Sequence, residues 1–330
     1  MIFWILTSVI AVVVCIGLAL VPIRQSAPAI PPNTPEHTPE LDLAGYSDAA
    51  PARPIELLFI HHSVGGQLLA DAGEESGTDA RRCIYDAHPN GGGLRRKLQQ
   101  NGFRVHEASY SSAIGQHTDL LDWLPKFREQ LDRIQRTEHQ DQLLGGAVNR
   151  VVMFKSCYPN SAFKLDNPRA PKILTLVNAR AAMRALRDVL ARHPTTLFVY
   201  VTAPPLRARA SSERLWKIVT KRLLNKPDSA TEQTHAANTA RVFNNWMRSP
   251  SGWLEGYAAR NIVVFDYFNI LTGDGRSNFL QFASRDGTDD HPSSTGQQIA
   301  AERYVPFLNR AVRYAGLETS SLSTPFASHE

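Results

Sequence analysis

The chain has 330 residues, of which 43% are apolar, 20% are charged and 8% are aromatic. These fractions exclude a disordered chain, a collagen and a coiled coil, and they are typical of a globular protein that buries a large core. The 36 basic and 31 acidic side chains leave a net charge of only +5.

The first 22 residues contain no charged side chain and precede the first basic residue, Arg24. About 20 apolar residues in a helix match the roughly 30 Å hydrocarbon core of a bilayer. A cleavable signal sequence is the alternative, but the charged start and small-residue cleavage site of such a sequence are not evident. We predict that residues 1–23 are a transmembrane anchor, with membrane contact through residues 2–22. The rest of the chain is then expected outside the cytoplasm, in the periplasm or at the cell surface.

The composition changes twice after this segment. Residues 24–54 are rich in Pro and Ala and bury too little apolar surface to fold, so they predict an extended linker. Residues 55–315 alternate apolar and polar stretches and form the predicted domain, and residues 316–330 are a polar tail.

Within the domain, short apolar runs of strand length alternate with longer stretches of helical period. In chain order these predict a strand at 55–60, a helix at 94–100, a strand at 103–108, a helix at 118–136, a strand at 150–154, a helix from 176 to His193-Pro194, a strand at 197–201, a helix at 234–247, a strand at 262–265 and a helix from 296. This order predicts an α/β fold with three α/β/α layers and a flavodoxin-like, parallel five-stranded sheet. Ligands of such sheets bind at the carboxyl ends of the strands, where function should be sought.

The first predicted strand is followed by His61-His62-Ser63-Val64-Gly65-Gly66. A serine on a tight turn between strand and helix exposes its hydroxyl, and glycines let a substrate approach the backbone N–H groups. The alternative is that Ser63 only caps the next helix.

The third strand is followed by Lys155-Ser156-Cys157-Tyr158-Pro159-Asn160-Ser161. The Asn160 amide could donate a hydrogen bond to a developing oxyanion at this edge of the sheet. The alternative is an ordinary turn, because Pro, Asn and Ser all favour turns.

The last helix is preceded by Asp286-Gly287-Thr288-Asp289-Asp290-His291-Pro292-Ser293. A histidine beside a carboxylate has its tautomer fixed and its charged form stabilised, as a general base requires. Helix capping is the alternative for the acidic residues and the serine, but capping needs no histidine.

Taken together, these three motifs resemble the SGNH (GDSL-like) hydrolase superfamily over about residues 55–312. The resemblance implies that Ser63 is the nucleophile and also an oxyanion donor, and that His291 is the base. It implies Gly115, in Ser112-Ala113-Ile114-Gly115, and Asn160 as the other oxyanion donors. It implies neither a metal nor an organic cofactor.

The sequence departs from the family pattern in three places. His-His-Ser replaces the usual Gly-Asp-Ser, and the asparagine motif after the third strand is altered. The family places its aspartate three residues before the histidine, where this chain has Thr288, so Asp289 is the first choice of acid and Asp290 the second. Asp286 would serve only in a bulged loop, and a Ser-His dyad without an acid is also known in the superfamily.

Other side chains near these motifs are candidates for substrate binding. They are His62, Lys155 and Cys157. Neither His61 nor His62 is predicted to bind zinc, because no second cluster with ligand spacing accompanies them. Cys83 and Cys157 could form a disulfide in an oxidising compartment, and two separate thiols are an equal alternative.

Residues 206–226 combine seven basic residues with interleaved apolar ones. They predict a basic amphipathic helix. Three roles are possible for it: a solvated helix that packs on the domain, a contact with the membrane surface, or binding of an anionic polysaccharide. Nucleic acid is not expected, because the rest of the chain lacks a basic-aromatic motif.

The sequence thus predicts a serine esterase that hydrolyses an O-acyl ester, with O-acetyl the first choice, on a cell-envelope or secreted polysaccharide. A non-catalytic glycan- or partner-binding protein with the same fold is one alternative. A lipase or thioesterase acting at the membrane surface is another.

Overall fold

The computed structural model describes residues 41–166, 170, 172–210, 215–224 and 227–318. The predicted anchor, residues 1–23, lies outside these ranges. None of the helices in the described ranges has the length and apolar character needed to cross a bilayer.

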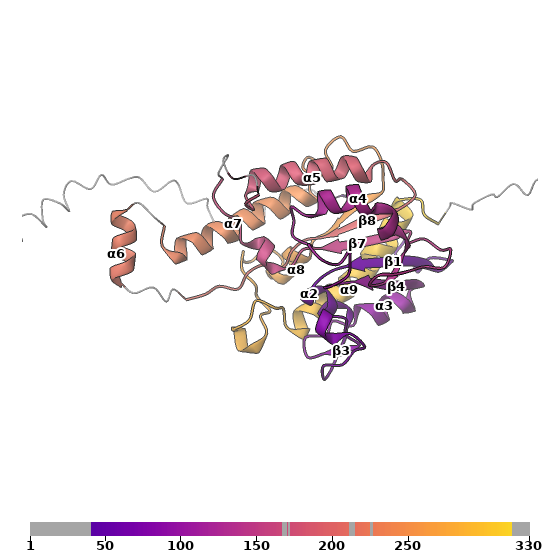
Figure 1. Ribbon diagram of the computed structural model, residues 1–330, viewed down its shortest axis with the longest axis horizontal. Coiled ribbons are helices and arrows are strands. Elements are labelled where there is room, and N and C mark those ends of the chain that lie inside the picture. Colours follow the sequence, from indigo (N-terminus) through magenta and orange to yellow (C-terminus); the bar gives the residue numbers. More distant parts are fainter. Residues whose placement is uncertain (1–40, 167–169, 171, 211–214, 225–226, 319–330) are drawn as a thin grey trace, which may run out of the picture. The chain divides into compact units, whose positions relative to one another are not determined.

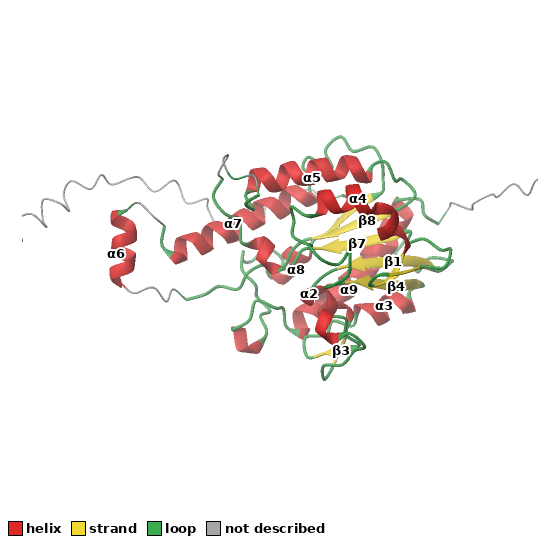
Figure 2. Ribbon diagram, in the orientation of Figure 1, coloured by secondary structure: helices red, strands yellow, loops and turns green. Residues whose placement is uncertain are grey.

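The five predicted strands lie next to one another in one sheet (Figures 1 and 2). They are β1 (Ile55–Ile60), β4 (Phe103–Ala108), β7 (Val151–Lys155), β8 (Leu197–Val201) and β9 (Ile262–Phe265). Their order is β4-β1-β7-β8-β9, and every neighbouring pair is parallel. Counted along the chain this is the flavodoxin-like order 2-1-3-4-5, in which the chain reverses its direction of winding at the first strand. The carboxyl end of β1 is therefore the expected ligand position.

Within the described residues, the sheet has seven strands rather than the predicted five. Beyond β4 it continues through β5 (Thr137–His139), parallel to β4, and β6 (Gln142–Leu143), antiparallel to β5. Strands of two or three residues are too short to show an alternating pattern, which explains why the sequence did not reveal them. For the same reason a separate two-stranded ladder of β2 (Asp71–Ala72) and β3 (Ala87–His88) was not predicted.

The two faces of the sheet pack against two apolar cores. Leu57 and Phe59 of β1 belong to one core, and Leu58 and Ile60 belong to the other, because successive side chains of a strand point to opposite faces. The first core is covered by α2 (Ser63–Leu69), α3 (Leu94–Gln100) and α9 (Ser294–Tyr314), and the second by α4 (Trp123–Arg136), α5 (Leu176–Leu190) and α7 (Ser229–Arg248). Figure 1 shows these layers on either side of the sheet.

The remaining helices are short. They are α6 (Leu215–Leu223), α8 (Tyr267–Leu271) and the 3₁₀ segments η1 (Ala80–Arg82), η2 (Tyr158–Ser161) and η3 (Arg285–Gly287). Helix α6 falls in the predicted basic segment, and its Trp216 and Leu223 side chains are exposed.

The folded domain begins before residue 55. Leu43 is buried in the first core, and the Tyr46 ring packs edge-on against Tyr314 with centroids 5.6 Å apart. Asp48 pairs with Arg310 at 2.7 Å. The predicted linker therefore ends earlier than residue 54, because these side chains pack on α9. The predicted tail likewise begins too early, since Leu317 is also buried in the first core.

Candidate active site

Ser63 lies on a tight turn at the carboxyl end of β1. It is the first residue of α2, and His62, with extended backbone, is the N-cap residue. The N–H groups of Gly65 and Gly66 donate to the His62 carbonyl at 2.8 and 3.1 Å. A Cβ on Gly65 would lie 2.3 Å from the His61 Cβ, so this close turn needs glycine. The His62 side chain makes no capping bond, and the Ser63 hydroxyl lies within reach of His291 and Cys157.

Three predicted residues are joined in series by hydrogen bonds. The Ser63 Oγ lies 3.1 Å from His291 Nε2, and His291 Nδ1 lies 2.8 Å from Asp289 Oδ1. The Nδ1–H donates to the carboxylate, which leaves Nε2 as an acceptor facing the serine hydroxyl. This is the geometry in which a histidine removes the proton of an attacking serine.

Asp289 contacts His291 although the two residues are only two positions apart, whereas the family pattern has a spacing of three. Its Oδ1 also accepts a hydrogen bond from the His291 backbone N–H at 3.2 Å. Burial opposes ionisation of this carboxyl, but the hydrogen bonds from His291 outweigh that effect and hold the pKa of Asp289 below its usual value. Arg285 and Asp286, both with positive φ, bend the preceding chain, and the Asp286 side chain is exposed.

Asp290, the second choice of acid, is directed elsewhere. Its Oδ1 accepts a hydrogen bond from the Arg207 backbone N–H at 3.0 Å, and its Oδ2 pairs with the Arg209 guanidinium. Asp290 thus ties the start of the basic segment to the loop that carries His291.

The loop after β7 contributes two side chains next to the serine and the histidine. The Cys157 Sγ lies 3.7 Å from the Ser63 Oγ. The Tyr158 ring packs edge-on against His291, with ring centroids 5.1 Å apart and an angle of 75° between the rings. Tyr158 was not among the predicted site residues, and its position directly after Cys157 was the available signal.

Lys155, a predicted substrate-binding residue, is fully buried. Its ammonium donates to the Ser156 carbonyl at 3.1 Å, and burial lowers its pKa. A side chain with no exposed surface in this structure does not offer its ammonium to solvent.

The predicted oxyanion donors Gly115 and Asn160 already have partners. The Gly115 N–H donates to Ser112 Oγ at 2.9 Å. The Asn160 Nδ2 donates to Asp119 Oδ1 at 2.8 Å, and its Oδ1 accepts from the Leu120 backbone N–H at 2.7 Å. Their role in an oxyanion hole stays a prediction, and for Gly115 it requires the bond to Ser112 to open.

His62, a predicted substrate-binding residue, contacts Gly115 and Tyr110. Its Nε2–H donates to the Gly115 carbonyl at 2.7 Å, and its ring stacks on Tyr110 with centroids 3.7 Å apart. Burial lowers the pKa of His62 to about 4, against the opposing effect of the Gly115 bond, so its imidazole is neutral at neutral pH. Within the described ranges, no group of three or more His, Cys, Asp or Glu side chains has the arrangement of a metal site.

Sequence reasoning missed the polar residues behind the nucleophile. His61 is fully buried, and it contacts Glu107, which is 2% exposed. The available signal was a glutamate within a predicted strand, since an acidic residue is almost never fully buried without a partner.

No protein-family model and no curated protein matches this chain. Among solved structures, it is similar to the acetylxylan esterase Axe2 from Geobacillus stearothermophilus, with 15% identity, 80% of this chain and 95% of that chain covered, and a TM-score of 0.40. A variant of the same enzyme matches with 15% identity, 82% and 97% coverage and a TM-score of 0.40. A carbohydrate esterase with divergent catalytic and non-catalytic binding functions matches with 13% identity, 79% and 67% coverage and a TM-score of 0.35. All three of these structures are of esterases.

Proposed function

We propose that this protein is a serine hydrolase that cleaves carboxylic esters. The observation that carries the proposal is the series of hydrogen bonds from Ser63 through His291 to Asp289 at the carboxyl end of β1. A serine cap on a helix would need neither the histidine nor the aspartate.

In the proposed reaction, the Ser63 Oγ attacks the ester carbonyl while His291 Nε2 takes the hydroxyl proton. The bond to the alcohol then breaks, and His291 returns the proton to the leaving oxygen. Water, activated by His291, next attacks the acyl-serine and releases the carboxylic acid and the free enzyme. Asp289 holds the imidazole in the required tautomer and stabilises its charged form throughout.

The Ser63 N–H supplies one donor to the oxyanion of each tetrahedral intermediate. Preorganised donors of this kind commonly provide a large part of the rate enhancement of acyl transfer. Gly115 and Asn160 are the proposed further donors.

For the substrate, we propose an O-acyl group, with O-acetyl the first choice, on a cell-envelope or secreted polysaccharide. Cys157 and Tyr158 crowd Ser63 and His291, which supports a small acyl group. The basic segment, residues 206–226, is joined through Arg207 and Arg209 to Asp290 beside His291, which supports an anionic polymer as substrate. The proposed membrane anchor, residues 2–22, would hold the domain close to such a polymer.

One observation favours a second candidate, an esterase for longer acyl chains. A pocket of about 730 Å³ is lined by both apolar and polar residues, among them Phe163, Leu165, Ile173, Leu206 and Arg209. Arg209 connects this pocket to Asp290 and thereby to the neighbouring histidine. An acyl chain held there would make the protein a lipase or thioesterase.

The test compares the full-length wild type with Ser63→Ala and His291→Ala on nitrophenyl esters from acetate to dodecanoate. We expect both variants to lose activity by several orders of magnitude. Ser47→Ala and His193→Ala are matched controls outside the site and should retain activity. A preference for acetate supports the first substrate class, and a preference for long chains supports the second. If the folded wild type is inert on every ester, the catalytic proposal is wrong and a binding protein becomes the better explanation.

A further inference from the structure

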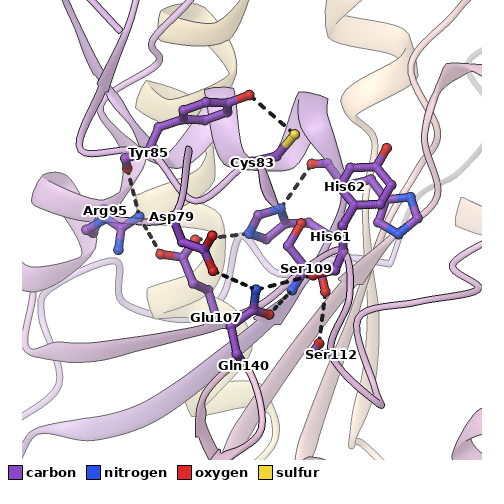
Figure 3. A network of polar contacts seen from close by, with 11 residues as sticks. His61, His62, Asp79, Cys83, Tyr85, Arg95, Glu107, Ser109, Ser112 and Gln140 are labelled. Carbon is purple, nitrogen blue, oxygen red and sulfur yellow. Dashed lines mark hydrogen bonds and ion pairs between the residues drawn. The ribbon is translucent and has the colours of Figure 1, made fainter. Parts of the chain in front are cut away.

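Arg95, Glu107 and His61 form a connected series of polar contacts next to His62, the residue before Ser63 (Figure 3). Arg95 of α3 pairs with Glu107 Oε1 at 2.6 Å, and Glu107 Oε2 lies 3.0 Å from His61 Nε2. His61 is fully buried, Glu107 is 2% exposed, and the Arg95 side chain is 24% exposed. The His61 ring is confined by Phe59, at 4.8 Å between centroids, and by the close approach of Gly65.

The two ring nitrogens of His61 have different neighbours. Its Nδ1 lies 3.0 Å from the His62 carbonyl oxygen, which can only accept a hydrogen bond, so Nδ1 carries a proton. Burial alone would raise the pKa of Glu107, but the His61 hydrogen bond and the Arg95 charge outweigh it and lower that pKa. An ionised Glu107 also only accepts, so each ring nitrogen of His61 faces an acceptor, the His62 carbonyl oxygen at Nδ1 and the Glu107 carboxylate at Nε2.

The His62 carbonyl is the end point of this series of contacts. It accepts hydrogen bonds from three donors, the N–H groups of Gly65 and Gly66 and the Nδ1–H of His61. This carbonyl belongs to the same peptide group as the Ser63 N–H. A hydrogen bond to the carbonyl of a peptide polarises it and strengthens its N–H as a donor, because hydrogen bonds in series reinforce one another.

We propose that His61, held by Glu107 and Arg95, is a positioning residue that polarises the His62–Ser63 peptide group and so strengthens the Ser63 N–H as an oxyanion donor. This inference rests on the proposed esterase function and deepens it. A buried ion pair commonly stabilises a fold no better than apolar residues of the same size. A contribution to stability alone therefore does not account for this network.

The same two strands carry a matched control cluster. Glu56 of β1 lies 2.7 Å from His106 Nε2 and 2.8 Å from Arg104 Nη1, both on β4. This cluster also joins a glutamate, a histidine and an arginine, but Glu56 is near the amino end of β1, whereas Ser63 follows its carboxyl end. Glu107→Gln and Glu56→Gln therefore remove the same charge from the same pair of strands at different distances from the site.

The first experiment measures kcat and KM of both variants with an acetyl ester, at a temperature where circular dichroism shows them folded. We expect Glu107→Gln to lower kcat about 10-fold with KM unchanged, since complete loss of an oxyanion donor costs about 100- to 1,000-fold. Glu56→Gln should keep the wild-type kcat. Equal kcat values in the two folded variants would overturn the proposal, because they would leave the network with a structural role only.

The second experiment needs no substrate. In nitrogen-15 NMR of the resting wild type, both ring nitrogens of His61 should carry protons, and Glu107→Gln should remove one of them and shift the Ser63 amide nitrogen. An unprotonated ring nitrogen on His61 in the wild type, or an unmoved Ser63 amide, would overturn the proposal. A wild type inert on all esters would instead contradict the esterase function itself, and the catalytic part of this inference with it.

Discussion

The Cys157 Sγ lies 3.7 Å from the Ser63 Oγ, so a thiol is in contact with the hydroxyl of the proposed nucleophile. A small group attached to this sulfur would occupy the volume that the acyl group needs. We predict that a methylthiolating reagent lowers the esterase activity of the wild type at least about 10-fold, whereas Cys157→Ala stays active after the same treatment. Cys83→Ala, which removes the other described cysteine, should remain sensitive. Equal inactivation of Cys157→Ala would show that the reagent acts elsewhere.

The neighbours Asp289 and Asp290 should differ sharply when each is changed to asparagine. Asp289→Asn removes the carboxylate partner of His291 Nδ1 and should lower kcat by about 10,000-fold, because the imidazole loses its tautomer and its charge stabilisation. Asp290→Asn acts on Arg207 and Arg209 and should leave kcat within a few-fold of wild type. Steady-state kinetics with a nitrophenyl ester measure both. A larger loss in Asp290→Asn would mean that the acid is misassigned.

The turn that carries Ser63 should tolerate no side chain at Gly65. Its Cβ would lie 2.3 Å from the His61 Cβ, so Gly65→Ala forces backbone or side chain to shift and should lower the free energy of unfolding by about 1–3 kcal/mol. Gly45→Ala is the control, because nothing lies within 4 Å of a Cβ there. Urea denaturation followed by circular dichroism compares the two. A Gly65→Ala variant as stable as Gly45→Ala would contradict the described packing.

His62 should make the protein less stable in mild acid. Its pKa is lowered from 6.5 to about 4 in the folded state, so the unfolded chain binds more protons between these values. The contribution of neutral His62 to the free energy of unfolding is therefore fully present above about pH 6.5, and it is lost as the pH falls toward 4. Replacing His62 with glutamine should flatten this part of the stability–pH curve, as measured by urea denaturation across the range. An unchanged slope would contradict a lowered pKa at His62.

Much of the fold follows from local patterns that the sequence displays openly. Four of the five predicted strands are largely apolar, because both faces of a parallel sheet are buried, whereas β4 (FRVHEA) carries several polar residues; all five lie within one residue of their predicted bounds. Because ligands of parallel sheets bind at the carboxyl ends of the strands, Ser63, just after β1, could then be predicted to lie in the site. The hydrogen-bonded series with His291 joins residues 228 positions apart, and only the resemblance to a family made it predictable.

The rest depends on partners that no local pattern reveals. Glu107 and His61 meet because β4 pairs with β1 in a register that sets Glu107 opposite Phe59. The choice between Asp289 and Asp290 depends on how the loop bends at Arg285 and Asp286, both with positive φ. Neither the register nor the bend can be read from residue spacing.

The two-residue step from Asp289 to His291 bears on how related chains should be sought. Here one carboxylate oxygen accepts hydrogen bonds from both the imidazole and the backbone N–H of the same histidine. The carboxylate therefore reaches the imidazole across a spacing of two residues, one fewer than the spacing of three described above. A text pattern that fixes the distance between acid and base at three residues passes over such a chain. Searches that instead superpose oxygen, imidazole and hydroxyl atoms in space would find chains with this arrangement whose loops differ in length by a residue.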